Sequence, residues 1–459
     1  MKMVKYLIKD FVRSKAHPIG LFLLLAAGLT SLEIGSRFLN RAERISEKTA
    51  VHQEESIRRN VSHSSDDLGN LMYYLRFGLE NEVPRLAGLS IGQRDIYPSV
   101  QSVTVRNLEE QRYTTDLMNP LFQLLGNMDF SFVLIYFFPL VIVAFGFNLM
   151  SEEREGGTWS LVLSQTNSPM RFLGVKLGIR LISVLAVLML LLAISVYYLA
   201  IPVDKYFMAF SLIAILYVLF WFAMVWLVIS FQLSSNLNAQ ILLTSWVLLN
   251  LIVPAGINVV KRYLFPIPEA MTAVIENREG YHAQWDRKKE PTMEHFYNKY
   301  PQYSKYHHSD DQDFSWLWYF AMQQLGDDEA SESIGNLKEK LVQRMEMANL
   351  LSWIVPTVHT QLSLNSVSFS DLGNYLSFMN ALESFHEGKK DFFFSKIFEG
   401  KPVSSVDWAS FTLEEFQDQQ PVLWTKILVP FILAFLILLV WANRNFTKSG
   451  IYSNENKAS

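Results

Sequence analysis

Apolar residues along this chain are gathered into six blocks, each about as long as a membrane-crossing helix, with strongly polar stretches between them. At a rise of about 1.5 Å per residue, roughly 20 residues cross the hydrocarbon layer of about 30 Å. The uninterrupted apolar part of the first block, 18–34, is near the lower limit of that length. We therefore predict an all-α membrane protein with six transmembrane helices, at residues 18–36, 129–150, 172–201, 206–233, 239–260 and 422–443.

The Lys and Arg residues beside the spans predict their direction. The N-terminal tail, 1–17, is strongly basic, and basic residues also outnumber acids in the C-terminal tail, 444–459. Both tails are therefore expected in the cytoplasm, which agrees with an even number of spans. The segment 151–171 is then also cytoplasmic, while 37–128 and 261–421 form two extracytoplasmic domains.

Residues 1–17 also have the pattern of an amphipathic helix that lies at the membrane surface. Lys5, Lys9 and Arg13 recur every four residues and form one basic stripe on a helix, while apolar residues cover the other side. Such an interfacial helix binds membrane lipid at the headgroup layer. Two alternatives remain open: a basic anchor that only sets topology, and a cleavable signal peptide, although no clear cleavage site follows.

The first outer segment is predicted to be mainly helical. A polar helix is expected over 38–58, projecting from the first span. A break with a good N-cap occurs within 63–68, and a second helix is predicted over 68–80. The alternating residues 100–105 predict a short strand.

The second outer segment is also predicted to be mainly helical, with helices over 336–353 and 371–385. Residues 297–319 are dense in Tyr, Trp and Pro, and we expect an irregular lid there. Their aromatic side chains either close a small core or line a substrate path.

Composition excludes several classes of function. Half of the residues are hydrophobic, 18% are charged, the net charge is −4 and there is no cysteine. Disulfides, cysteine-ligated zinc, iron–sulfur clusters and thiol catalysis all need cysteine, and nucleic-acid binding needs a basic surface. Neither a phosphate-binding P-loop nor a Gly-x-Ser-x-Gly pattern occurs. We predict no catalytic residue, no cofactor in this chain and no nucleic-acid partner.

Some histidines and charged residues are candidates for metal binding or for ion pairs near the membrane. The run from His307 to Asp313 contains metal-capable side chains, but neighbouring residues rarely converge on one ion, so we interpret it as a solvated loop and predict no metal site. His359 and His386 are interpreted as structural. Asp129 and Lys426, at the outer ends of two spans, either pair or face water.

The most informative local pattern lies in the inner segment 151–171. Two glycines interrupt the chain, Thr158 is a suitable N-cap for a short helix through Ser164, and Ser168 with Pro169 begins another helix. The short helix would lie along the membrane face and present apolar residues beside charges, which suits docking into a partner's groove. The alternative is an ordinary loop with solvated charges. The predicted partner-binding residues are Glu152, Glu153, Arg154, Glu155, Gly156, Gly157, Thr158, Trp159, Leu161, Pro169, Arg171 and Lys176.

This pattern resembles the coupling region of ABC type-2 exporter permeases, namely the Glu-Arg-Glu-x-Gly-Thr run, the Leu-containing helix, Ser-Pro, Arg171 and Gly174-x-Lys176. Trp159 stands where that family commonly has Leu. The stretches at 92–98, 119–120, 137–140 and 349–356 resemble the large-ectodomain branch, which includes copper-enzyme-maturation and gliding-associated permeases.

The resemblance implies a permease subunit of an exporter in the bacterial cytoplasmic (inner) membrane. It implies a second permease subunit, as a homo- or heterodimer, and ABC ATPase subunits that bind ATP and Mg²⁺ and contact the inner loop. The spans at 129–150 and 239–260, both of which contain proline, are then expected to rearrange, and the outer domains to gate cargo or to hand it to a periplasmic partner. The alternative is an ATP-driven mechanical or signalling module that acts without transport.

Overall fold

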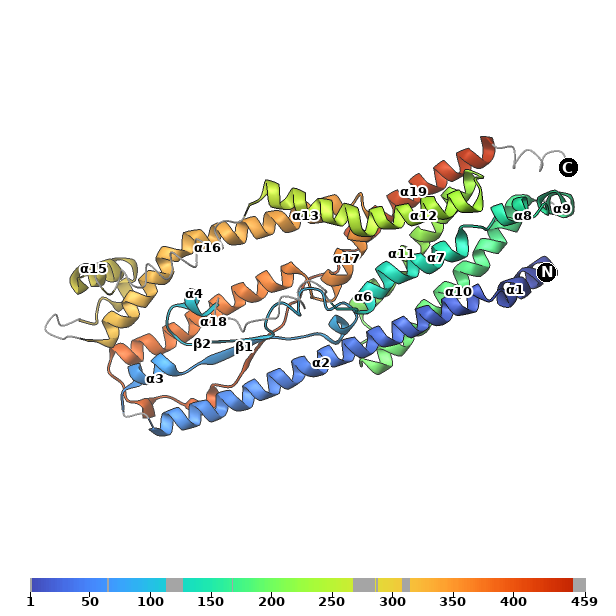
Figure 1. The fold of residues 1–459 in the computed structure, drawn as a ribbon. Helices are drawn as coiled ribbons and strands as arrows, with labels where there is room; N and C mark the ends of the chain where they lie inside the picture. Colours follow the sequence, from blue (N-terminus) through green and yellow to red (C-terminus); the bar gives the residue numbers. More distant parts are fainter. Residues whose placement is uncertain are drawn as a thin grey trace.

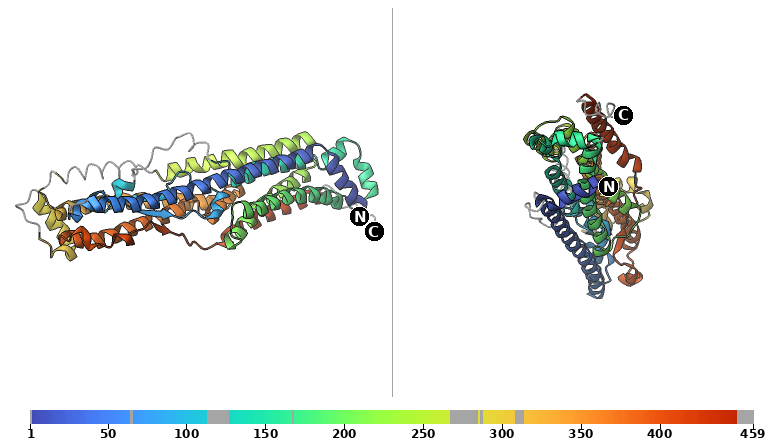
Figure 2. Two further views of the ribbon diagram at one scale, coloured as in Figure 1. Left: turned by 90° about the horizontal axis from the view of Figure 1, so that it is seen from below. Right: turned by 90° about the vertical axis from the view of Figure 1, so that its right-hand side faces the viewer.

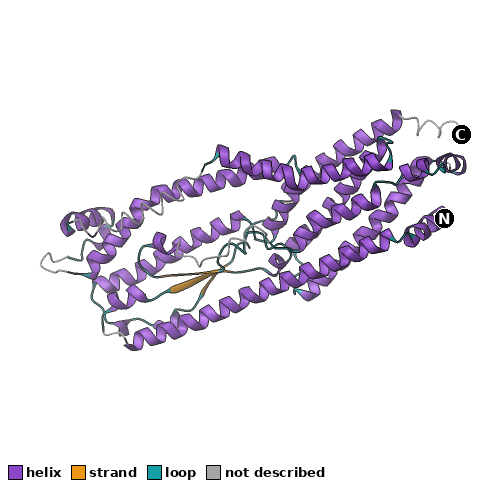
Figure 3. Ribbon diagram, viewed as in Figure 1, coloured by secondary structure: helices purple, strands orange, loops and turns teal. Residues whose placement is uncertain are grey.

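Helices dominate the computed structural model, which describes residues 2–63, 66–112, 127–166, 168–266, 285, 288–307 and 314–448 (Figures 1 and 3). Six helices in this described part are long and apolar enough to cross a membrane. They are Ala16–His63, Phe130–Glu155, Pro169–Tyr198, Lys205–Ser230, Ser235–Leu264 and Trp424–Lys448. The prediction of an all-α membrane protein with six spans is confirmed.

The elements of the spanning bundle come in two runs, interrupted by the two outer segments after α2 and after α13. They are α1 (Lys2–Arg13), α2 (Ala16–His63), α6 (Phe130–Phe132), η2 (Val133–Phe137), α7 (Phe138–Gly146), α8 (Ser151–Glu155), α9 (Trp159–Gln165), α10 (Pro169–Tyr198), α11 (Lys205–Ser230), α12 (Ser235–Val247), η3 (Leu248–Ile252), α13 (Val253–Leu264) and α19 (Trp424–Lys448). Helix α1 and the last turns of α19 lie at the same end of the molecule as α8 and α9 (Figures 1 and 2).

The outer part of the molecule lies at the opposite end of this bundle (Figure 2). Its elements are α3 (Leu68–Tyr74), β1 (Phe77–Asn81), η1 (Arg85–Gly88), β2 (Val100–Val103), α4 (Leu108–Arg112), α15 (Lys289–Lys299), η4 (Pro301–Tyr303), α16 (Trp316–Ser352), α17 (Pro356–Val367), α18 (Leu372–Phe398), η5 (Val403–Ser405), η6 (Trp408–Ser410) and β3 (Glu414–Phe416).

Helix α2 joins the bundle to the outer part without interruption. Its 48 residues extend about 72 Å, more than twice the thickness of the hydrocarbon layer. Beyond the apolar first half, Leu39, Ala42 and Ile57 are buried, so the helix continues to pack after it becomes polar. The helix predicted over 38–58 is therefore confirmed, as a continuation of the first span.

The region around β1 departs from the sequence prediction. Asp67 caps α3, and its side chain accepts a hydrogen bond from the backbone N–H of Asn70, so the predicted N-cap is confirmed. The helix predicted over 68–80 is wrong beyond Tyr74, because the chain becomes strand β1. That strand pairs antiparallel with β2 and parallel with β3, giving the order β2-β1-β3. Pairing with β3, more than 300 residues away, overrides the weak local preference.

The aromatic stretch of the second outer segment closes a core. Helical elements occupy parts of the predicted lid, at 297–299, 301–303 and 316–319, and its irregular description is wrong there. Residues 308–313 of the lid lie outside the described residues, as do residues 119–120 of the first outer segment. Phe296 stacks on Tyr303 with ring centroids 5.7 Å apart, and Phe320 packs on Phe394 at 5.3 Å. The predicted helices at 336–353 and 371–385 are confirmed as parts of the longer α16 and α18.

Helix α17 packs among the spans, against α11, α19 and η3. The imidazole Nε2 of His359 lies 3.1 Å from the carbonyl oxygen of Ile427 in the first turn of α19. Thr357, at the same end of this short helix, lies beside Tyr217 near the middle of α11. Phe369, just after the other end of α17, packs against Tyr206 at the start of α11. Part of the second outer segment is thus wedged between the spanning helices.

Asp129 fixes the outer end of the second span. It is buried, and its carboxylate accepts hydrogen bonds from the backbone N–H of Phe132 at the start of the span and from that of Ile91 in a neighbouring loop, both at 2.8 Å. The N–H and the hydroxyl of Ser131 both donate to the carbonyl oxygen of Leu89. Of the two alternatives for Asp129, neither pairing with Lys426 nor facing water holds, because backbone N–H groups satisfy the carboxylate.

Candidate functional site

The second span ends in two short helices, α8 and α9, which occupy the predicted coupling segment at one end of the molecule (Figure 1). Gly156 ends α8, and Gly157 has φ +73°, a left-handed conformation that a residue with a side chain rarely adopts. This turn redirects the chain so that α9 can form. We call the side-chain contacts of residues 151–155 the inner clasp.

Glu155 and Ser151 tie the inner clasp to the fifth span. The Glu155 carboxylate accepts a hydrogen bond from the backbone N–H of Ser235 at 2.7 Å and one from its hydroxyl at 2.8 Å. The Ser151 and Ser235 hydroxyl oxygens are also 2.7 Å apart. An acid at the first turn of α12 satisfies an N–H group that has no partner within the helix. Glu155 is therefore an external cap for the fifth span.

Arg154 holds the turn between the fourth and fifth spans. Its guanidinium donates to the backbone oxygen of Gln232 at 3.2 Å and to the side-chain oxygen of the same residue at 2.5 Å. Gln232 has φ +56°, so this contact supports a left-handed turn residue. The guanidinium carbon also lies 5.9 Å from the ring of Trp159. Arg154 thus connects the turn to the first residue of α9.

Glu153 connects the inner clasp to the third span. The Nζ of Lys176 is 2.9 Å from the Glu153 carboxylate and 3.7 Å from that of Glu152, and Lys176 is almost fully buried in α10. The Thr158 hydroxyl donates to Glu153, at 2.5 Å from its carboxylate. Thr158 is the N-cap of α9, as predicted, but its side chain makes no capping hydrogen bond because it is turned back to Glu153.

The remaining predicted residues separate into a buried group and an exposed group. Pro169 is buried at the first position of α10, where the Ser168 hydroxyl accepts a hydrogen bond from the N–H of Arg171. Arg171 itself is exposed. On α9, Trp159 is partly buried against the bundle, while 56% of Leu161 is exposed. The structure therefore engages Glu153, Arg154, Glu155 and Lys176 in contacts with other residues of the same chain. The outer side of α9 remains exposed.

Several residues that hold the inner clasp and the neighbouring spans were missed from sequence. Gln232 lies at the end of the predicted fourth span and Ser235 just after it, and no role was predicted for either. Asn238 donates to the backbone oxygen of Phe147 at 3.0 Å, and buried Arg180 donates to that of Phe145. Polar residues within apolar blocks were the available signal, but their partners lie on other helices and cannot be read from local sequence.

Comparison with known proteins yields two family matches. Residues 86–226 match a family described as ABC-2 membrane transporter related, and this range contains the second and third spans, the inner clasp and most of the fourth span. The chain is related to ABC-2-type permeases. Residues 270–417, within the second outer segment, match a domain of unknown function (DUF3526). No curated protein and no solved structure gives a significant match.

The match and the six apolar helices together indicate a multi-pass membrane protein. Among the described residues, no group of three or more His, Asp or Glu side chains could hold a metal ion. His386 lies 2.7 Å from the backbone oxygen of Arg106 through its Nε2, and His359 contacts the Ile427 carbonyl, so both histidines bind backbone, consistent with a structural role.

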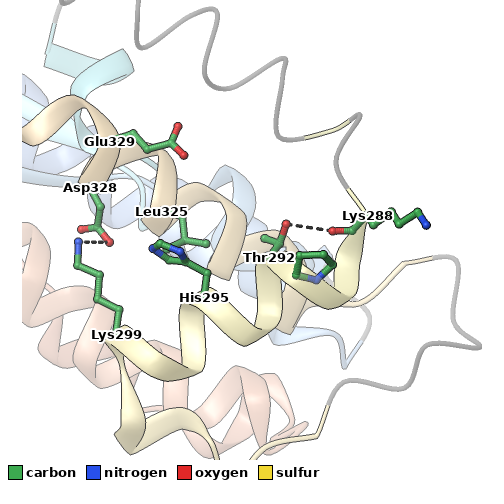
Figure 4. Close-up of a pocket in the computed structure, with 8 residues that line it drawn as sticks. Lys288, Thr292, His295, Lys299, Leu325, Asp328 and Glu329 are labelled. Atoms are coloured by element: carbon green, nitrogen blue, oxygen red, sulfur yellow. Dashed lines mark hydrogen bonds and ion pairs between the residues drawn. The ribbon is translucent and has the colours of Figure 1, made fainter.

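A polar pocket lies in the outer part, between α15 and α16 (Figure 4). Its volume is about 490 Å³, and its lining carries both signs of charge, with Lys288 and Lys299 at the two ends of α15 and Asp328 and Glu329 on α16. Lys299 and Asp328 already form an ion pair at 2.8 Å. A ligand for this pocket would have to compete with that pair and with solvent, so the inner clasp remains the stronger candidate site.

Proposed function

We propose that this chain is the membrane-spanning subunit of an ABC type-2 exporter and that α9 is its coupling helix. The observation that carries the proposal is the geometry of α8 and α9. The inner clasp binds the third span through Lys176 and the turn between the fourth and fifth spans through Gln232, while the outer side of α9 keeps Leu161 exposed. A force applied to α9 would therefore reach three neighbouring spans.

The partner for this surface is an ABC ATPase, which binds ATP and Mg²⁺ and hydrolyses the nucleotide. The relation of residues 86–226 to ABC-2 transporters supports this assignment. An exposed leucine beside acidic and basic side chains is the chemistry that a groove on a partner surface recognises. In this proposal both chain ends and α9 lie in the cytoplasm, the membrane is the bacterial inner membrane, and the outer part faces the periplasm.

A second permease subunit completes the assembly. The fifth span lies at the edge of the bundle, and only 6% of its most apolar 18-residue stretch is buried. Leu243, Leu251 and Val259 are exposed along one continuous path over α12, η3 and α13. Apolar faces in a membrane can meet lipid, but they also serve as helix-packing surfaces. We propose that this face meets the second permease, as a homo- or heterodimer.

The experiment targets α9 without disturbing the inner clasp. Leu161→Asp places a charge on the proposed docking face, and Val51→Asp is the matched control, because Val51 is a similarly exposed helical residue in the outer half of α2. The parent chain and Val51→Asp are expected to co-purify with an ABC ATPase and to stimulate its ATP hydrolysis. Leu161→Asp is expected to reduce both at least tenfold. Equal co-purification by all three chains would contradict the assignment of α9.

A mechanical role without transport is the second candidate. It is favoured by α2, which passes without a break from the inner end of the molecule into the outer part. Inner-membrane vesicles distinguish the two candidates, provided that the reconstituted complex hydrolyses ATP. ATP-dependent accumulation of cargo supports an exporter. Nucleotide-dependent movement of the outer part without flux supports a mechanical module that acts on a periplasmic partner.

A further inference from the structure

Two prolines interrupt the backbone of the second and fifth spans in the same way. Pro139 and Pro254 have no N–H group, so the carbonyl oxygens four residues earlier, of Ile135 and Asn250, lose their usual helical donor. Each proline lies two residues after the end of a π-helical segment, η2 or η3. Such segments widen a helix locally and are frequent at functional positions. Both spans therefore have a weakened turn.

The fourth span supplies the missing donor. Tyr217, which is fully buried in α11, donates its hydroxyl proton to the carbonyl oxygen of Ile135 at 3.1 Å, inside η2. The same hydroxyl lies 3.4 Å from the side-chain oxygen of Asn250, inside η3. One tyrosine thus lies between the weakened turns of two different spans.

A second contact joins the same turns. The indole Nε1 of Trp246 donates to the carbonyl oxygen of Tyr136 in η2 at 3.2 Å, and the side-chain amide of Asn250 donates to the backbone oxygen of Trp246 at 3.0 Å. Asn250 is 3% exposed. In a bundle without surrounding water, each of these polar groups depends on its neighbours for hydrogen bonding.

The Tyr217 hydroxyl also has alternative neighbours. Thr357, at the start of α17, and Trp221, one turn further along α11, both lie beside it. The Thr357 hydroxyl oxygen and the Trp221 Nε1 are buried and have no partner of hydrogen-bonding geometry among the described residues. A hydroxyl carries one proton and can donate it to one acceptor at a time. Ile135, Asn250 and Thr357 therefore offer competing acceptors on three different elements.

We propose that Tyr217 is a positioning residue that latches the proline-weakened turns of the second and fifth spans. While the hydroxyl donates to Ile135 or to Asn250, both of which lie within hydrogen-bonding distance of it, the outer parts of both spans are held at fixed angles. Transfer of the hydrogen bond to Thr357 releases those angles and gives α17, which continues into the outer part, a defined contact instead. This device goes beyond the proposed function, because it needs neither a nucleotide nor an identified cargo.

The absence of cysteine from the chain allows a direct test in the full-length protein. Spin labels on Met128→Cys and Val259→Cys, both exposed positions beyond the weakened turns, report the distance between the outer ends of the two spans. Labels on Ala144→Cys and Leu243→Cys report the inner halves. In lipid nanodiscs, Tyr217→Phe is expected to widen the outer distance distribution about twofold and to leave the inner one unchanged. Tyr197→Phe, at a position near the end of α10 that is 92% exposed, is the matched control and should change neither.

Asn250→Leu provides an independent variant, since it removes the acceptor in η3 and keeps a similar volume. It is expected to widen the distance distribution between the outer labels as Tyr217→Phe does. If Tyr217→Phe does not fold, Asn250→Leu alone tests the proposal. The proposal is overturned if the folded variants give the parental outer distribution, or if Tyr197→Phe widens it equally. Because no ATPase is present, neither result depends on the proposed transport function.

Discussion

The two ends of the second span are held in contrasting ways. At the outer end, the buried Asp129 binds backbone N–H groups of Ile91 and Phe132. At the inner end, exposed Arg154 and Glu155 bind the turn before the fifth span. A buried carboxylate with backbone donors is costly to disturb, whereas exposed charged contacts exchange readily with water.

This difference assigns different mechanical properties to the two ends. The outer end is fixed to the loop at 89–95, which in turn contacts the connection between α17 and α18 through Gln93 and Arg94. Arg94 is partly buried, and the loss of solvent around its guanidinium lowers its pKa to about 10; it donates to the carbonyl oxygen of Phe369 at 2.6 Å. The inner end can adjust at low energetic cost. A partner that pushes on the inner end of the second span would therefore displace that end, while the outer end keeps its position.

The largest expected loss of stability comes from a substitution at Gly35, which lies close to the loop that holds the outer end of the second span. A Cβ at Gly35 of α2 would lie 2.0 Å from the backbone oxygen of Gly88, next to the loop that binds the second span. Gly35→Ala must push these backbones apart, and we expect a loss of more than about 3 kcal/mol and little folded protein. Gly178→Ala in α10 is the matched control, because its Cβ meets no atom within 4 Å. Fluorescence size-exclusion profiles of the two variants measure the effect, and equal profiles would contradict the close approach.

A smaller loss is expected from Asp129→Ala. It leaves the N–H groups of Ile91 and Phe132 without their acceptor in a buried setting, at a cost of about 2–4 kcal/mol. Asp129→Asn keeps one acceptor oxygen and should lose less. Thermal unfolding in detergent measures both variants. A melting temperature for Asp129→Ala equal to the parent value would show that this end is not the fixed one.

Acidification is expected to strengthen the outer part further. Burial raises the pKa of Asp95 and Asp371, and it raises that of Asp327 to about 6. Because these values lie above those of the unfolded chain, the folded state binds protons more tightly, and stability rises as the pH falls from about 7 toward 5. The expected gain is about 1 kcal/mol, read from melting temperatures across that range. Asp327→Asn should make the melting temperature less dependent on pH. A melting temperature of the parent protein that rises from pH 5 to 7 would contradict the raised pKa values.

The smallest effect on global stability is expected at the inner clasp. Glu155→Ala removes the cap from the first turn of α12, yet the residue is exposed, so the melting temperature should remain close to the parent value. Hydrogen–deuterium exchange at Ser235 and the next two amides should become several-fold faster, because the Ser235 N–H loses its acceptor. Glu155→Gln retains an acceptor and should exchange at an intermediate rate. Unchanged exchange in Glu155→Ala would show that the inner clasp does not hold the fifth span.

Local signals predicted the features that depend on nearby residues. The apolar blocks predicted the spans, the glycines at 156–157 predicted the break before α9, and Ser168 with Pro169 predicted the start of α10. The strand β1 was not predicted, because its partner β3 lies far along the chain. Glu153, Arg154 and Glu155 were predicted as a docking surface, whereas the structure shows them bonded within the chain; a role in partner binding remains a proposal.

The sequence by itself determined that this chain has six helices long and apolar enough to cross a membrane and that a short polar segment between two of them forms a helix. Length, apolar content and capping residues act over a few turns and can be read in order along the chain. Only the tertiary structure decided that Asp129 fixes one end of the second span, that Arg154 and Glu155 hold the other, and that Tyr217 bridges two weakened turns. Each of these depends on a donor meeting an acceptor from a distant segment, and such meetings arise only when the helices pack.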